Sequence, residues 1–558
     1  MVLLRLLPLI FAVSCASPKI VPIDPKSLDL SEQVLFSLEE KSAKILYVLH
    51  RQGFNKALDL YFEQNESNER FYILSKLLAA FLNHGLQKKN YPYHLHAIFA
   101  SGISARLDLY ALEMGLNSHD PQAQFASLYF LAQMHDDEAD QIMLKAFASP
   151  FDSVRLQAAF YLAKKNKAQG QIHTLMLKLP SAYKPLFAKL FAMSDERASS
   201  AILRRLISSS DPDLVLQCVL AIGENSRDDF VKDLRLLLSQ NNLLIQEAAA
   251  KALGILQDSH SIQTLRRLAL SSHSHLSLSA LEALFLLGDL TAIEGIKAHA
   301  KMDNLYAIIL LGKFAREVDF LKELSESKDL QVRTNANIAL ILAKRTSKEG
   351  FCDVLCSDER QLLLKKQYSP GFGLYSYRRE LPDASFDSDF QKEYSLHLRE
   401  ELLVEASSQP DFFDIVEPTF SEDELLPLLC WILAKDSDQK SFELLQEKSQ
   451  SVGHSFLRDY ASLALYKKEP SDRLREDLIR YLHLYAKHDF VRFRQYLPFF
   501  MAPKEKDFNA EQRTRLFIEI AEALSLSEKG IDALIDAMRD LSIEKQYLLA
   551  GIVLSAIE

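Results

Sequence analysis

The chain has 558 residues, of which 48% are hydrophobic and 25% are charged, as in an ordinary folded protein. Its formal net charge of −10 argues against a protein that binds nucleic acid, because phosphate-binding proteins normally carry a basic excess. The 16 Gly and 18 Pro are about half the usual share, and so few chain breakers predict long helices joined by short turns.

The N-terminus begins with an apolar run. Residues 1–13 carry one charge, at Arg5, and the small residues Ala12 and Ser14 stand shortly before Cys15. This order resembles a bacterial lipoprotein signal, in which the Cys sulfur receives the lipid. The resemblance implies a signal peptide over 1–14, a Pro-containing tether over 15–27, and export to the periplasmic side of a bacterial membrane with a lipid anchor at Cys15. An uncleaved N-terminus on a cytoplasmic protein is the alternative.

Residues 28–118 follow without a clear repeat. Apolar residues recur every three or four positions in 33–53, 71–85 and 93–115, which predicts helices. The end units of a repeat array differ from the inner ones, because one of their sides faces water. We therefore expect 28–118 to form an N-terminal helical cap or divergent repeats.

A recurring two-helix unit is the strongest signal in the sequence. Ile245, Ala249, Ala252 and Leu253 share one helical face, and a second amphipathic helix starts at Ile262. The same two-helix pattern appears one unit earlier in the chain, over 214–222 and 231–237. A unit of this kind cannot bury its apolar face alone, so we expect the units to stack. The position of Gly254 recurs, around an irregular stretch near Leu311 and Gly312, at Ala132, Ala163, Ala192, Gly223, Gly288 and Ile341.

In several units, the residues before the first helix favour the start of a helix. Asp120, Ser149 and Asp211 are each followed by Pro, and Asp329 precedes a further copy of the unit. An Asp or Ser side chain can accept hydrogen bonds from the free N–H groups of a first turn, where Pro also fits. These residues are therefore predicted N-caps.

The best copies resemble the HEAT and HEAT-like (PBS-lyase-type) repeat family, whose units carry Asp-Pro, then Val-Arg, then an Ala-rich run. Val154-Arg155 with Ala158, and Val332-Arg333 with Ala336, match this pattern. The resemblance implies an all-α fold, an α-solenoid or superhelix of stacked antiparallel helix pairs, over residues 119–359.

The chain changes character after this array. Gly, Pro and aromatic residues gather in 360–393, which predicts an irregular insert or a linker between two solenoid segments. Residues 394–558 are helical again and are predicted to be divergent repeats. The insert contains a candidate partner surface of aromatic and basic residues, namely Phe372, Tyr375, Tyr377, Arg378 and Arg379.

The sequence offers no catalytic, cofactor-binding or metal-binding set. The pairs His94/His96 and His273/His275 are two positions apart, so on a helix they point to different sides. Cys352 and Cys356 lack the further ligands of a zinc site. An aromatic stretch between residues 481 and 500 has the spacing of a packed core more than that of a binding groove.

We therefore expect a non-enzymatic scaffold that binds another protein and needs no cofactor and no nucleic acid. A cytosolic adaptor or assembly factor is one alternative. An enzyme on a HEAT-like scaffold, resembling bilin lyases or DNA glycosylases, is the other.

Overall fold

A computed structural model describes residues 30–355 and 399–557, apart from 65–69, 88–92, 105–108, 195, 346–347, 401, 405, 408–411, 422–424, 453–454 and 489–507. The regular structure in these residues is helical, and they contain no β-strand. This confirms the predicted all-α class. The chain divides into two compact units. The first holds α2, α3 and most of α4, together with Ile557, and the second runs from Gly85 to Ala556.

The first unit is built from α2 (Leu30–Gln52), α3 (Phe54–Gln64) and α4 (Arg70–Gln87). Gly53 joins α2 to α3 at a φ of +92°, which glycine adopts without steric cost. Phe54 at the start of α3 stacks on Phe81 of α4, with ring centroids 3.7 Å apart. The turn and this aromatic contact hold the three helices together.

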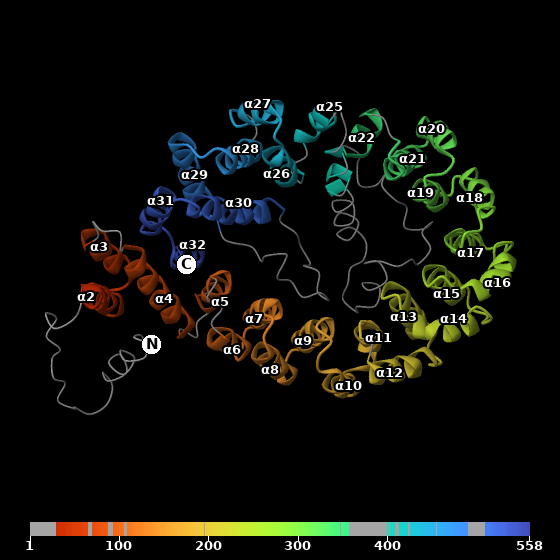
Figure 1. Cartoon of the computed structure of the whole chain (residues 1–558), viewed down its shortest axis with the longest axis horizontal. Helices are drawn as coiled ribbons and strands as arrows, with labels where there is room; N and C mark the ends of the chain where they lie inside the picture. The colour runs from red at the N-terminus through yellow and green to blue at the C-terminus, as the bar shows by residue number, and fades with distance from the viewer. Residues whose placement is uncertain are drawn as a thin grey trace. The chain divides into compact units, whose positions relative to one another are not determined.

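Most of the second unit is a series of helix pairs. Figure 1 shows the first and second helices of the pairs between α7 and α22 as two layers, which confirms the α-solenoid. The first helices are α7 (Pro121–Gln133), α9 (Asp152–Lys164), α11 (Lys184–Ala192), α13 (Pro212–Glu224), α15 (Leu243–Ile255), α17 (Ser274–Leu286), α19 (Leu305–Lys313) and α21 (Leu330–Leu342). The second helices are α8 (Asp137–Lys145), α10 (Gln169–Lys178), α12 (Arg197–Ile207), α14 (Val231–Leu237), α16 (Ile262–Leu268), α18 (Ala292–Ala300), α20 (Val318–Ser325) and α22 (Lys348–Leu355).

A further helix pair precedes α7. It consists of α5 (Tyr93–Ile103) and α6 (Leu109–Leu116), which pack on each other and on α7. The predicted helical segment 93–115 is therefore formed by two helices. Two helices form because each of them buries an apolar side of its own, with Ala97 in α5 and Leu112 in α6 fully buried.

The predicted N-caps are confirmed at three of four positions. The side chains of Asp120, Asp211 and Asp329 each accept a hydrogen bond from the backbone N–H two positions further on. Ser149 does not cap a helix. Its Oγ accepts from the N–H of Phe151 at 3.2 Å, and α9 begins only after that turn.

The predicted core face is buried. Ile245, Ala249, Ala252 and Leu253 are at most 2% exposed. Leu265, on the apolar side of the second helix, is fully buried. The register read from the sequence repeat is therefore correct in this unit.

Small residues let neighbouring first helices approach closely. A Cβ on Gly254 of α15 would lie 2.6 Å from Cα of Ala283 in α17, and one on Gly312 of α19 would lie 2.4 Å from Cα of Ala339 in α21. Each contact joins the C-terminal halves of two first helices, so these helices run in the same direction.

Two details of the predicted alignment are wrong. Gly288 lies beyond the end of α17 at a φ of +91°, where it terminates the helix instead of packing between repeats. The stretch around Leu311 and Gly312 is a complete helix pair, α19 and α20. The alignment missed this pair because the repeat is shorter here. The start of α21 follows the start of α19 after fewer residues than separate the starts of α15 and α17, or of α17 and α19.

The C-terminal part also consists mainly of helix pairs. α26 packs on α28 and α28 on α30, while Gly551 of α32 approaches α5 so closely that a Cβ there would lie 2.4 Å from the carbonyl oxygen of Ala100. The predicted segments 1–14, 15–27 and 360–393 lie outside the described residues. The helices are α25 (Phe412–Val416), the 3-10 helix η9 (Pro418–Ser421), α26 (Leu426–Lys435), α27 (Gln439–Lys448), α28 (Ser455–Lys468), α29 (Asp472–Tyr485), α30 (Phe508–Ser525), α31 (Glu528–Met538) and α32 (Ile543–Ile557).

Candidate functional site

Basic residues recur at the same position of four successive second helices, α12, α14, α16 and α18. Each reaches acidic side chains in the following repeat, at or just after the turn between its two helices. We call these pairs the ion-pair ladder. In one of them Arg266 donates from Nη2 to Oδ2 of Asp289 over 2.9 Å. The pairs are Arg204 with Asp229 and Asp233, Arg235 with Asp258, Arg266 with Asp289, and Lys297 with Glu317.

A second set of charges lies between the first helices α15, α17 and α19. We call Lys251, Glu282, Tyr306 and Lys313 the charged cluster. The Nζ of Lys251 lies 3.7 Å from Oε2 of Glu282, and the Nζ of Lys313 lies 3.3 Å from Oε1. The hydroxyl of Tyr306 donates to Glu282, and the ammonium of Lys251 stands 4.4 Å from the centroid of the Tyr306 ring.

Burial decides the electrostatics of the charged cluster. The side chains of Lys251 and Glu282 are only 6% and 8% exposed. Burial lowers the pKa of Lys251, although Glu282 and Glu247 act to raise it. Burial acts to raise the pKa of Glu282, but Lys251, Lys313 and the hydrogen bond from Tyr306 lower it overall. Glu282 therefore stays ionised, and its pairing holds three successive repeats in register.

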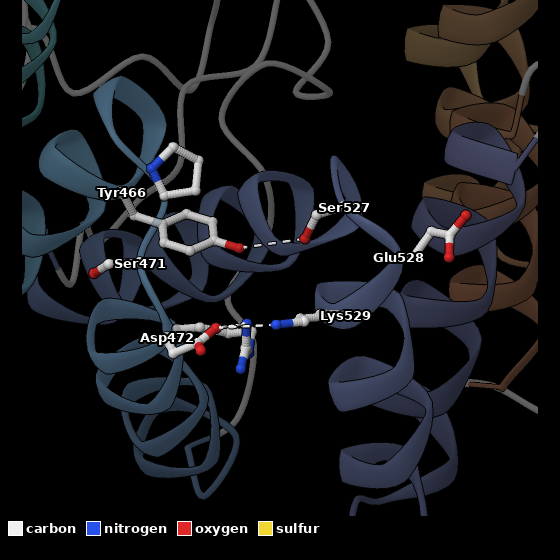
Figure 2. Close-up of a pocket in the computed structure, with 8 residues that line it drawn as sticks. Tyr466, Ser471, Asp472, Ser527, Glu528 and Lys529 are labelled. Carbon is white, nitrogen blue, oxygen red and sulfur yellow. Dashed lines mark hydrogen bonds and ion pairs between the residues drawn. The ribbon is translucent and has the colours of Figure 1, made fainter.

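A surface pocket of about 450 Å³ lies between the turns that precede α29 and α31 (Figure 2). The Nζ of Lys529 stands 3.6 Å from Oδ1 of Asp472, which also accepts from Arg475 over 2.7 Å. Ser471 and Ser527 cap the two helices that start there. Lys529 and Arg475 are engaged with Asp472, and both serines are helix caps. The pocket is therefore better suited to holding the two turns together than to catalysis.

The turns between successive repeats carry exposed apolar side chains. Since the first helices α15, α17, α19 and α21 run in the same direction, the turns that lead into them lie along one edge of the stack. Leu270 and Met302 are 87% and 68% exposed there. Single exposed apolar residues are ordinary on protein surfaces, but a row at repeat spacing is a candidate contact surface. We call this row the apolar edge; its members are Leu243, Leu244, Leu270, Met302 and Leu330.

Cys15 lies outside the described residues, as do Phe372, Tyr375, Tyr377, Arg378 and Arg379. In the aromatic stretch, Tyr481 and Tyr485 are buried in α29, and Tyr485 donates a hydrogen bond to Asp459 of α28. These two tyrosines are core residues, as their spacing indicated.

Of the histidine and cysteine pairs singled out in the sequence, Cys356 lies outside the described residues. His273 is exposed, whereas His275 influences the ionisation of His299 in α18. Cys352 contacts the carbonyl oxygen of Ile415. Within the described ranges, no group of three or more His, Cys, Asp or Glu is placed to hold a metal ion. No helix in the same part of the chain has the length and apolar character needed to span a bilayer.

Sequence reasoning missed both charged arrangements, although a signal for each was present. Lys251, Glu282 and Lys313 occupy equivalent positions in successive repeats, as do the bases of the ion-pair ladder. Aligning charged positions as well as apolar ones would have found them.

The stacked helix pairs define the class of this protein, a helical-repeat solenoid. Residues 199–284 match the family of HEAT repeats, and this segment runs from α12 to α17 through the first rungs of the ion-pair ladder. This segment is therefore HEAT-like, as its sequence resemblance implied. No curated protein matches the chain.

Proposed function

We propose that this chain is a non-enzymatic scaffold that binds another protein along its HEAT-like stack. The observation that carries this proposal is the parallel stacking of successive first helices, which repeats equivalent side chains along one edge. Repeat solenoids commonly use such extended surfaces to bind partners, and contacts spread over several repeats add up without any enclosed pocket.

The apolar edge supplies the described part of this surface. Leu270 and Met302 lie in consecutive turns, so a partner that buries both must contact two repeats. Burying such side chains is favourable at about 25 cal/mol for each Å² of apolar area. The partner we propose is a protein that presents apolar side chains to this edge. The aromatic and basic residues between Phe372 and Arg379 are a second proposed contact.

The cellular location that we propose is the periplasmic side of a bacterial membrane, with a lipid on Cys15. The order of an apolar run, small residues, Cys15 and a Pro-containing tether supports it. A single acyl chain anchors a protein only weakly, so stable attachment requires the two or three chains that a lipidated N-terminal Cys carries. A cytosolic adaptor that retains Met1 is the alternative.

Site-specific crosslinking tests the partner surface. Leu270 and Met302 are replaced, one at a time, by a photo-crosslinking amino acid in the full chain. The matched control is Leu290, which is 61% exposed in the turn after α17, on the opposite edge. We expect one and the same protein to crosslink from Leu270 and Met302 and not from Leu290. Equal capture from all three positions, or capture from Leu290 alone, would refute the proposed surface.

The purified partner then gives a quantitative test. Leu270→Asp should weaken binding by about tenfold or more, because a charge would be buried against an apolar surface. Leu290→Asp should leave the affinity unchanged. Equal affinity of both variants would contradict the proposal.

Mass spectrometry of the mature N-terminus tests the proposed cellular location. A diacylated or triacylated Cys15 at the first position is the expected result, and Cys15→Ser should move the protein from the membrane to the soluble fraction. An intact Met1 would establish the cytosolic alternative and would leave the partner surface untouched.

A further inference from the structure

Three polar groups form a chain of hydrogen bonds at the boundary between the repeats α15–α16 and α17–α18. Ser277 in the first turn of α17 donates from Oγ to the carbonyl oxygen of Ala269, which directly follows α16, over 2.7 Å. The ring Nε2 of His299 in α18 lies 3.0 Å from the same Oγ. The turn between the two repeats is thus tied to α18 through Ser277.

The first of these bonds defines the tautomer of His299. A serine hydroxyl has one proton, and Ser277 gives it to the Ala269 carbonyl, so its oxygen can only accept from His299. The neutral His299 ring therefore carries its proton on Nε2. Its Nδ1 then bears a lone pair, and this atom is buried and has no hydrogen-bond partner.

Among the described residues, Nδ1 of His299 has no hydrogen-bond acceptor for a second proton. His275 of α17 acts electrostatically on His299, and its own Nδ1 is also buried without a partner. On α17 and α19, which pack against α18, Glu282 and Lys313 are engaged with each other in the charged cluster. On α18 itself Lys297 binds Glu317. A proton on Nδ1 of His299 would be a buried donor without an acceptor.

We propose that His299 is a pH-sensitive latch, which ties the turn over residues 269–273 to α18 while its ring is neutral and releases this turn when the ring is protonated. The latch acts at one repeat boundary, inside the segment that crosses the apolar edge at Leu270. Acidification would therefore loosen one repeat boundary while the close contact of Gly254 with α17 persists.

The shift in the pKa of His299 agrees with release of the latch at low pH. Burial, and next the influence of His275, lower the pKa of His299. A released ring has the ordinary histidine pKa of about 6.5. The closed latch is therefore fully favoured above about pH 6.5, and it loses stability as the pH falls from there towards the lowered pKa of the closed state.

Hydrogen exchange of the full chain, measured by mass spectrometry between pH 5 and pH 8 and corrected for intrinsic rates, tests the latch. Protection of the peptide over residues 269–277 should fall by up to about tenfold for each pH unit below about 6.5, as expected for the uptake of one proton on release. The turn over residues 239–242 contains no His and should keep constant protection.

Three variants give the test its control. His299→Gln can still donate to Ser277 but cannot titrate, so protection of 269–277 should become independent of pH. His275→Gln removes the neighbouring ring, raises the pKa of His299 and should reduce the loss of protection. His260→Gln alters a side chain that is 78% exposed and should behave like the unmodified chain.

Either of two results would overturn the latch. One is constant protection of residues 269–277 in the unmodified chain. The other is an unchanged loss in the His299→Gln variant or, should that variant not fold, in His275→Gln.

Discussion

The ammonium of Lys251 lies 3.7 Å from a carboxylate oxygen of Glu282, and the two residues occupy the same position in successive repeats. Both side chains are buried, so each is the other's main counter-charge. Removing one partner of such a pair is costly because it leaves an uncompensated buried charge.

Glu282→Gln should therefore lower the free energy of unfolding by about 3–5 kcal/mol, the range found for broken buried pairs. Lys251 would remain buried with only the weaker influence of Glu247, whereas Lys313 can turn to solvent. The double variant Lys251→Met with Glu282→Gln should recover most of the loss, since the glutamine oxygen still accepts from Tyr306. Urea denaturation of the three proteins measures this, and a single variant as stable as the unmodified chain would contradict it.

Gly254→Ala should destabilise the array by about 1–3 kcal/mol. The added Cβ would meet the backbone of Ala283 at 2.6 Å, and no side-chain rotation can relieve that contact. Gly170→Ala in α10 is the matched control, because nothing lies within 4 Å of its Cβ position. Stability there should be unchanged or slightly raised, as expected from helix propensity. Equal thermal midpoints for the two variants would show that Gly254 is not at a packed boundary.

Leu253→Asp should cost on the order of several kcal/mol, because it places an unpaired charge at a fully buried position. Leu290→Asp introduces the same charge at a side chain that is 61% exposed and should have little effect. The difference in denaturation midpoint between the two variants is the measurement. Normal stability of the first variant would contradict the repeat register.

The ion-pair ladder should make stability depend on pH in the acid range. Burial acts to raise the pKa of Asp258, but the hydrogen bonds from Arg235 and Ser261 lower it overall. The stabilisation is complete above the unfolded pKa of about 3.9 and is lost as the pH falls through the lowered folded value.

Asp258→Asn should therefore flatten the acid limb of a plot of unfolding free energy against pH. Asp319→Asn, at a side chain that is 100% exposed, is the control and should leave the limb as it is. If both variants lost the acid limb, the pH dependence of stability would come from the net charge of the protein and not from the ion-pair ladder.

The helices and their packed faces follow from the sequence because they depend on local rules. The repeat period identified Leu253 and its equivalents as core positions, and Asp120, Asp211 and Asp329 as caps, since both signals lie within one or two helical turns. Gly288 misled the alignment because a glycine serves equally at a close contact and at a helix end. Only the backbone conformation, a φ of +91°, distinguishes the two roles.

What the tertiary structure alone decided is which polar groups of different helices meet. His275 and His299 lie on different helices, α17 and α18, so no spacing rule joins them. Their approach, like the pairing of Glu282 with Tyr306, depends on how far one helix is shifted and rotated against the next. That geometry is set by side chains such as Gly254 and Ala283 packing together, which is a property of the assembled stack and of no single unit.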